Sequence, residues 1–159
     1  MHKNRLEKEF VVDHRETTRG LKALKDALTA NDDVAVLDAA QRLDRVAGPH
    51  IAFEEQWLYP LVAESRGEEF RHHMTSEHDE VVDALSKIQA CDGLATVSAA
   101  RKAEWQRNLQ TGLDHVITCG TLLSHLSVLD EVERVEILRR LQDLRDEGIL
   151  WTELAAKKA

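Results

Sequence analysis

The apolar residues of this chain recur at alternating steps of four and three over four long segments, and this spacing constrains the fold most strongly. The first segment carries the stripe Leu6, Phe10, His14, Thr17, Leu21, Leu24 and Leu28. Similar stripes run over about 37–61, 70–88 and 105–126. Residues at this spacing lie on one face of an α-helix. We therefore predict an all-α fold, an up-down-up-down four-helix bundle with short connections.

Helix-ending residues separate the stripes at Asn31-Asp32-Asp33, Arg66-Gly67 and Cys91-Asp92-Gly93. Pro49 follows Gly48 inside the second segment, so we expect a kink or a break just before His50. Asp130 is expected to cap an additional C-terminal helix that packs outside the bundle, with a break at Gly148. We expect a single domain over 1–159, with the bundle at about 4–128 and the C-terminal helix at about 130–157.

Composition excludes several classes of protein. Hydrophobic residues make up 43% of the chain and charged residues 31%, which argues against disorder. The net charge of −8 disfavours binding to nucleic acid or to an anionic membrane. No run reaches the roughly 18 to 20 apolar residues of a membrane helix, and no apolar leader follows the start. We expect a cytoplasmic protein in which Cys91 and Cys119 are free thiols.

One histidine lies in each of the four stripes, and this is the most informative chemical feature: His14, His50, His78 and His115. A buried imidazole without a hydrogen-bond partner costs about 1 to 3 kcal/mol. Any one of them could be an ordinary core histidine with satisfied nitrogens. Four together on facing helices are typical of a metal site inside a bundle.

Glu54 follows His50 by four residues, so their side chains differ by only about 40° around a helix. One helix can therefore supply both a nitrogen and a carboxylate ligand. A carboxylate can also bridge two metal ions, with one oxygen for each. The stripe places Glu54 inside the bundle and Glu55 outside it, on the solvated face.

An internal similarity relates the second and fourth segments. The ten residues from His50 to Tyr59 align without a gap on those from His115 to Ser124. In this alignment Cys119 takes the place of Glu54. The predicted ligand pattern is therefore HxxxE in the second helix and HxxxC in the fourth.

The order of these residues resembles the hemerythrin-like family, whose bundles carry His, HxxxE, His and HxxxE on successive helices. The stretch from His50 to Pro60, with its Leu-aromatic-Pro end, is similar to that family's second helix. The resemblance implies that the family's ligand positions are His14, His50, Glu54, His78 and His115. It also implies a non-haem iron site, usually with two irons bridged by carboxylates. Members bind dioxygen or handle peroxide, nitric oxide or iron.

The fourth helix departs from the family pattern, because Cys119 stands where the second carboxylate is expected and Gly120 follows it. Three alternatives remain open at this stage. Cys119 is a metal ligand as thiolate, or it lies unligated beside a weakened or mononuclear His/Glu site, or the site has degenerated and holds little metal. We include Cys119 among the candidate metal ligands.

The remaining histidines and aromatic residues are expected to lie outside the ligand set. His72 and His73 are predicted on the outer face near the start of the third helix. Glu77 is either an ordinary surface residue or an acid behind the ligands. His125 lies ten residues after His115, about 15 Å along a helix, and so belongs to another layer. Tyr59 is expected among the aromatic residues around the pocket.

Together with the resemblance, these features predict a non-haem di-iron protein that binds or activates dioxygen, peroxide or nitric oxide at an open metal position. A single iron or another divalent metal is the alternative cofactor. Whether it is an enzyme of oxidase or peroxidase type stays open. The alternative is an iron or redox sensor, or an iron-handling module, without turnover. A purely structural bundle is the third interpretation.

Overall fold

The apolar stripes fold into α-helices, as their spacing predicts. The computed structural model describes residues 4–158, which are almost entirely helical and contain no strand. The α-helices are α1 (Arg5–Ala30), α2 (Asp33–Phe53), α3 (Tyr59–Arg66), α4 (Glu68–Ala90), α5 (Ala99–Gly120), α6 (Glu131–Glu147) and α7 (Trp151–Ala156). A π-helical turn, η1 (Glu54–Leu58), joins α2 to α3, and two 3₁₀ segments are η2 (Leu94–Thr96) and η3 (Thr121–Val128).

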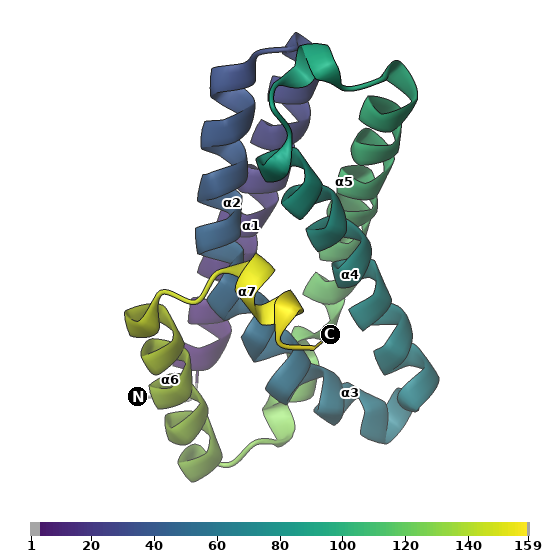
Figure 1. The fold of residues 1–159 in the computed structure, drawn as a ribbon. Coiled ribbons are helices and arrows are strands. Elements are labelled where there is room, and N and C mark those ends of the chain that lie inside the picture. Colours follow the sequence, from purple (N-terminus) through teal and green to yellow (C-terminus); the bar gives the residue numbers. More distant parts are fainter. Residues whose placement is uncertain (1–3, 159) are drawn as a thin grey trace.

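Four long rods form the bundle (Figure 1). They are α1, the continuous run of α2, η1 and α3, then α4, and α5. Contacts join α1 to α2, α2 to α4, α4 to α5 and α5 back to α1, so the rods surround one interior. The predicted all-α bundle is confirmed. No helix in the described part of the chain is long and apolar enough to cross a membrane.

The second rod differs from the prediction. Helix α2 runs without a break through Pro49 to Phe53, so the break expected before His50 is absent. The irregularity lies one turn later, in the π-helical turn Glu54–Leu58. There the backbone N–H of Tyr59 donates to the carbonyl of Glu54, five residues earlier. Such turns add a residue to the helix and occur frequently at functional sites.

The C-terminal part forms two helices instead of the single one predicted at about 130–157. Asp130 begins α6 with a capping box, as expected from its side chain. Gly148 ends α6 with φ of 66°, a left-handed conformation that favours glycine. The chain then turns back and α7 packs against α2 and α4 (Figure 1).

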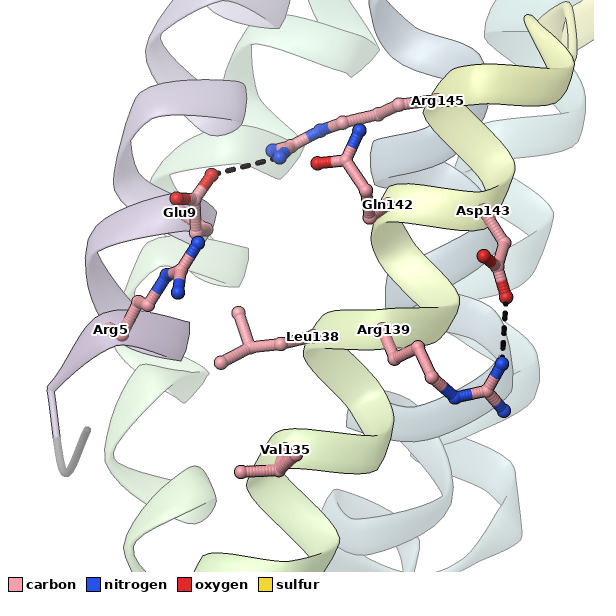
Figure 2. A pocket seen from close by; sticks show the side chains of 8 residues that line it. All are labelled: Arg5, Glu9, Val135, Leu138, Arg139, Gln142, Asp143 and Arg145. Atoms are coloured by element: carbon pink, nitrogen blue, oxygen red, sulfur yellow. Dashed lines mark hydrogen bonds and ion pairs between the residues drawn. The ribbon is translucent and has the colours of Figure 1, made fainter.

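Helix α6 is held against α1 by ion pairs around a surface groove (Figure 2). Arg145 of α6 contacts Glu9 at 2.9 Å and Asp13 at 2.7 Å, both on α1. Arg139 contacts Asp143 at 3.2 Å within α6 itself. These arginines already have carboxylate partners, so the groove is a docking contact between two helices rather than an anion site.

Two apolar clusters fill the bundle interior. One contains Phe10 and Met74, and the other contains Leu21 and Val81. In α1, His14 lies between Phe10 and Leu21; in α4, His78 lies between Met74 and Val81. The predicted polar residues therefore occupy a layer between two apolar layers.

Candidate metal centre

The polar layer is buried. The exposed fraction is 2% for His50, 1% for Glu54, 2% for His78 and 4% for His115, whereas His14 is half-buried. Apolar side chains above and below exclude water from these groups. Polar side chains so buried need hydrogen bonds, an ion partner or a metal.

Glu54 lies at the centre of this layer, and its two oxygens face different partners. Oε1 lies 3.0 Å from His50 Nε2 and 2.7 Å from Cys119 Sγ. Oε2 lies 3.1 Å from His78 Nε2 and 3.0 Å from the Tyr59 hydroxyl. The carboxylate thus separates the site into two halves, which we call the His50 half and the His78 half.

The His78 half contains the tightest group of potential ligands. One ligand atom from each of Glu54, His78 and His115 lies within 4.8 Å of the others. The Tyr59 hydroxyl lies 3.1 Å from His78 Nε2 and 2.9 Å from His115 Nε2. It also lies 3.8 Å from Cys119 Sγ. Side chains from three of the helical rods therefore place their potential ligand atoms close together.

His14 completes the His50 half. Its ring centroid lies 5.7 Å from that of His50, and its Nε2 is buried without a hydrogen-bond partner in the described structure. A Cβ atom built on Gly120 would lie 3.5 Å from Cε1 of His14, so Gly120 covers this ring closely. The six predicted site residues thus lie in one layer, with His14 making the fewest contacts.

Tyr59 was expected among the aromatic residues around the pocket, but helical periodicity did not place it at the centre of the polar layer. In a regular α-helix, a residue five positions after Glu54 lies about 140° away around the axis and points elsewhere. The π-helical turn contains one residue more than a turn of α-helix, so Tyr59 lies on the same face of the rod as Glu54. The signal in the sequence was the Tyr59-Pro60 pair that follows the ligand motif, because it places an aromatic residue next to a proline at the irregular turn.

Carboxylates support the histidines of the His78 half from behind. Glu55 Oε1 lies 2.9 Å from His78 Nδ1, and the side chain of Glu55 is only 11% exposed. The prediction that Glu55 lies on the solvated face is therefore wrong, because the π-helical turn rotates it toward α4. Glu77 Oε1 lies 3.5 Å from His115 Nδ1 and 3.2 Å from Nε2 of the exposed His73. Such partners orient imidazoles that bind metals.

The charges inside the layer lower the pKa of Glu54 and raise the pKa of His78. Burial by itself raises the pKa of Glu54, but the charge and hydrogen bonds of His50 and His78 hold it well below its usual value. Burial by itself lowers the pKa of His78, but hydrogen bonds to Glu54 and Glu55 raise it to about 9. Without a metal, an imidazolium between two carboxylates supplies the positive charge of the site.

His115, Cys119 and Tyr59 are held neutral. Burial, followed by the charge of His78, lowers the pKa of His115 to about 3. Burial and the nearby Glu54 raise the pKa of the Cys119 thiol and of the Tyr59 phenol well above their usual values. The thiol and phenol therefore act as hydrogen-bond donors to the carboxylate. A metal cation bound beside Glu54 would favour the thiolate of Cys119 and the phenolate of Tyr59.

These residues fit a metal ion. The donors are four imidazoles, a carboxylate, a phenol and a thiol, which together suit iron and other first-row transition metals. The buried Nε2 of His14 has no hydrogen-bond partner in the described structure, and a cation would satisfy it. The layer is also buried, and Glu55 orients His78 within it.

The other residues considered from the sequence lie away from this layer. His72 and His73 are exposed, as predicted. His125 makes a local contact, in which its Nδ1–H donates to the carbonyl of Leu122 in η3 at 3.1 Å. Cys91 is half-buried in the turn after α4, where it lines a surface pocket with Asp92.

Comparison with known proteins gives one match. The profile of the hemerythrin HHE cation-binding domain matches residues 6–127, about three quarters of the chain. No curated protein and no solved structure matches significantly. The matched region contains all six predicted site residues and Tyr59, and it ends within η3, before α6 and α7.

Proposed function

The chain belongs to the family of hemerythrin HHE cation-binding domains, and from this we propose that it is a non-haem di-iron protein. We propose further that it binds or activates a small ligand such as dioxygen, peroxide or nitric oxide. Cation binding is the property common to the family description and to the buried His/Glu cluster. The identity and number of the ions, and the external ligand, are the parts that experiment must test.

The observation that carries the proposal is the position of Glu54 between two sets of donors. Oε1 faces His50 and Cys119, and Oε2 faces His78 and Tyr59. A carboxylate that offers each oxygen to a separate set of lone pairs is suited to bridging two ions. A mononuclear site would need only one of these sets.

Each half supplies its own ligands in this proposal. The His50 half offers His14, His50, Oε1 of Glu54 and Cys119. The His78 half offers His78, His115, Oε2 of Glu54 and Tyr59. Cys119 and Tyr59 supply the negative charge that a second bridging carboxylate supplies in the family pattern. Glu55 holds His78 in orientation from its Nδ1 side, and Glu77 lies 3.5 Å from Nδ1 of His115.

The space beside the ligands favours a very small external molecule. The cavity lined by His50, Glu54, His78 and His115 has a volume of about 10 Å³, which is room for about one water molecule. Iron held by these residues would supply an open coordination position and a change of oxidation state. The protein residues exclude bulk water, fix the imidazoles and hold protons on Tyr59 and Cys119 until metal binds.

Metal analysis and Mössbauer spectroscopy on protein loaded with iron under anaerobic conditions test this proposal. We expect about two irons per chain in the wild type and none bound tightly in Glu54→Gln. Glu64→Gln, on the exposed face of α3, is the matched control and should keep both irons. A wild-type protein that remains free of metal after loading would overturn the proposal.

A sensor without turnover is the second candidate, and the position of Cys119 favours it. This thiol is fully buried and donates to the proposed bridging carboxylate. Oxidation of the thiol would remove that donor and change the metal site. If the protein is a sensor, peroxide should be consumed only stoichiometrically, and Cys119→Ser should abolish the response while Cys91→Ser retains it.

A further inference from the structure

The C-terminal end of the chain closes one side of the metal centre. Residues 149–158, which we call the C-terminal strap, lie beyond residues 6–127 that match the family profile. The strap contains α7, which crosses α2 and α4 at the middle of the bundle (Figure 1). The wall that it forms is therefore an addition of this chain to the matched region.

Trp151 is the strap residue that reaches the metal centre. Its side chain is buried, with an exposed fraction of 3%. The ring centroid lies 6.1 Å from that of His78, with an interplanar angle of 88°, so the two rings meet edge to face. Trp151 lines the same small cavity as His50, Glu54 and His115.

The start of the strap is fixed to α2. A Cβ atom on Gly48 would lie 1.9 Å from the carbonyl oxygen of Ile149, so the strap backbone rests directly on this glycine. Asp44, with an exposed fraction of 3%, accepts hydrogen bonds of 2.8 Å from both the backbone N–H and the hydroxyl of Thr152. These two contacts flank Trp151 and fix its position.

The end of the strap contacts the support of His78. Lys158 Nζ lies 2.8 Å from Glu55 and 3.3 Å from Asp79. Glu55 in turn holds His78 Nδ1 at 2.9 Å. The strap therefore touches the His78 half twice, through an aromatic wall and through an ion pair with the carboxylate that orients His78.

We propose that Trp151 determines which external ligands reach the metal in the His78 half, admitting molecules of two or three atoms and excluding ring-sized ones. This inference rests on the proposed function, because it names the class of ligand for the same site. The indole fills the side of the cavity that would otherwise open between α2 and α4. The remaining volume of about 10 Å³ is room for about one water-sized molecule and is too small for a ring.

Two variants open this wall in different ways. Trp151→Leu removes the ring, and Gly48→Ala introduces a methyl group where the strap backbone now lies. Trp105→Leu is the matched control, because Trp105 is equally buried, at 2%, but lines a pocket with Cys91 and Arg101 instead of the metal centre. Circular dichroism and thermal unfolding establish that each variant is folded before it is compared.

The first measurement uses metal-free protein and so does not depend on iron. Diethyl pyrocarbonate modifies neutral imidazoles, and mass spectrometry gives the rate at His115. We expect this rate to rise at least tenfold in Trp151→Leu and in Gly48→Ala, relative to both the wild type and Trp105→Leu. A rate in folded Trp151→Leu no higher than in Trp105→Leu would overturn the proposal.

The second measurement uses iron-loaded protein with nitric oxide and imidazole as the small and the ring-sized probe. Absorption spectroscopy should show nitric oxide binding within threefold of the wild type in Trp151→Leu, and at least tenfold tighter imidazole binding. Equal imidazole binding in both proteins would overturn the role of Trp151. If the wild type binds neither iron nor nitric oxide, the proposed function fails, and the modification of His115 still decides whether Trp151 closes the cavity.

Discussion

Cys119 Sγ lies 2.7 Å from Oε1 of Glu54, although the two residues are 65 positions apart and on different rods of the bundle. The Tyr59 hydroxyl contacts the other oxygen, Oε2, at 3.0 Å and lies 3.8 Å from the Cys119 sulfur. A thiol and a phenol therefore flank one carboxylate in the middle of the bundle. The first two predictions concern these two groups.

Cys119→Ser should retain the fold and lose the sulfur signature of the metal centre. The serine hydroxyl can still donate to Glu54, so we expect the free energy of unfolding of the metal-free protein to change by only about 1 kcal/mol. X-ray absorption of the iron-loaded wild type should show an iron–sulfur distance that the variant lacks. Cys91→Ser should keep this distance. The same iron–sulfur distance in Cys119→Ser would show that Cys119 is not a ligand.

Tyr59→Phe should affect the His78 half in both forms of the protein. Without metal, the loss of the hydroxyl leaves the buried His115 Nε2 without its 2.9 Å partner. We expect the free energy of unfolding, measured with urea, to fall by about 1 to 3 kcal/mol. With ferric iron, the visible absorption of a phenolate ligand should be present in the wild type and absent in the variant. If both proteins absorb alike, Tyr59 supports the site only by hydrogen bonding.

Glu55→Gln should weaken metal binding without removing a ligand. The amide keeps the shape of the side chain but loses the charge that orients His78 through Nδ1 at 2.9 Å. Loss of such supporting carboxylates reduces metal affinity by about 10-fold to 100-fold. Competition with a metal chelator measures this change. Glu64→Gln is the control, and an affinity of Glu55→Gln equal to that of this control would contradict the orienting role.

The stability of the metal-free protein should be greatest near pH 6.5. The pKa of His78 is raised to about 9 in the fold, so its contribution is complete below the unfolded value of 6.5 and is lost as the pH rises through 9. The pKa of His115 is lowered to about 3, so the unfolded chain takes up a proton as the pH falls below 6.5 and the folded state loses stability toward pH 3. The loss should amount to about 3 kcal/mol on the alkaline side and about 5 kcal/mol on the acid side, at about 1.4 kcal/mol for each pKa unit.

Urea unfolding between pH 4 and pH 9.5, with metal removed by chelation, measures this profile. His78→Gln should remove the fall on the alkaline side while leaving the fall on the acid side. His125→Gln, in η3 and outside the polar layer, should leave both. A wild-type profile that is flat above pH 7 would contradict the charged pair of His78 with Glu54 and Glu55.

The sequence predicted the parts of the site that follow regular helical spacing. His50 and Glu54 are four residues apart within one rod, and their contact at 3.0 Å is the one that this spacing requires. His14, His78 and His115 were found because each interrupts an apolar stripe, and a polar residue in such a stripe must lie inside the bundle. Cys119 was found by aligning two segments of the same chain.

The residues that the sequence misplaced all depend on irregular backbone. Glu55 belongs to the π-helical turn and Tyr59 follows it directly. Helical periodicity assigned Glu55 to the solvated face, and Tyr59 was expected only among the aromatic residues around the pocket. The continuous helix through Pro49 was missed for a related reason. Local propensity favours an irregularity at Pro49, whereas packing of the rod against α1 and α4 keeps it helical and moves the irregularity to Glu54–Leu58.

The amino-acid sequence by itself therefore determined the all-α bundle and the set of imidazole and carboxylate side chains that face its interior, because helical periodicity fixes the face on which each residue lies. Only the tertiary structure decided how these groups pair. Glu54 contacts Tyr59 across the π-helical turn of its own rod and Cys119 on another rod, and Trp151 of α7 packs against His78 of α4. The physical reason is that the relative height and rotation of packed helices, and the position of a π-helical turn, depend on contacts that no local sequence pattern encodes.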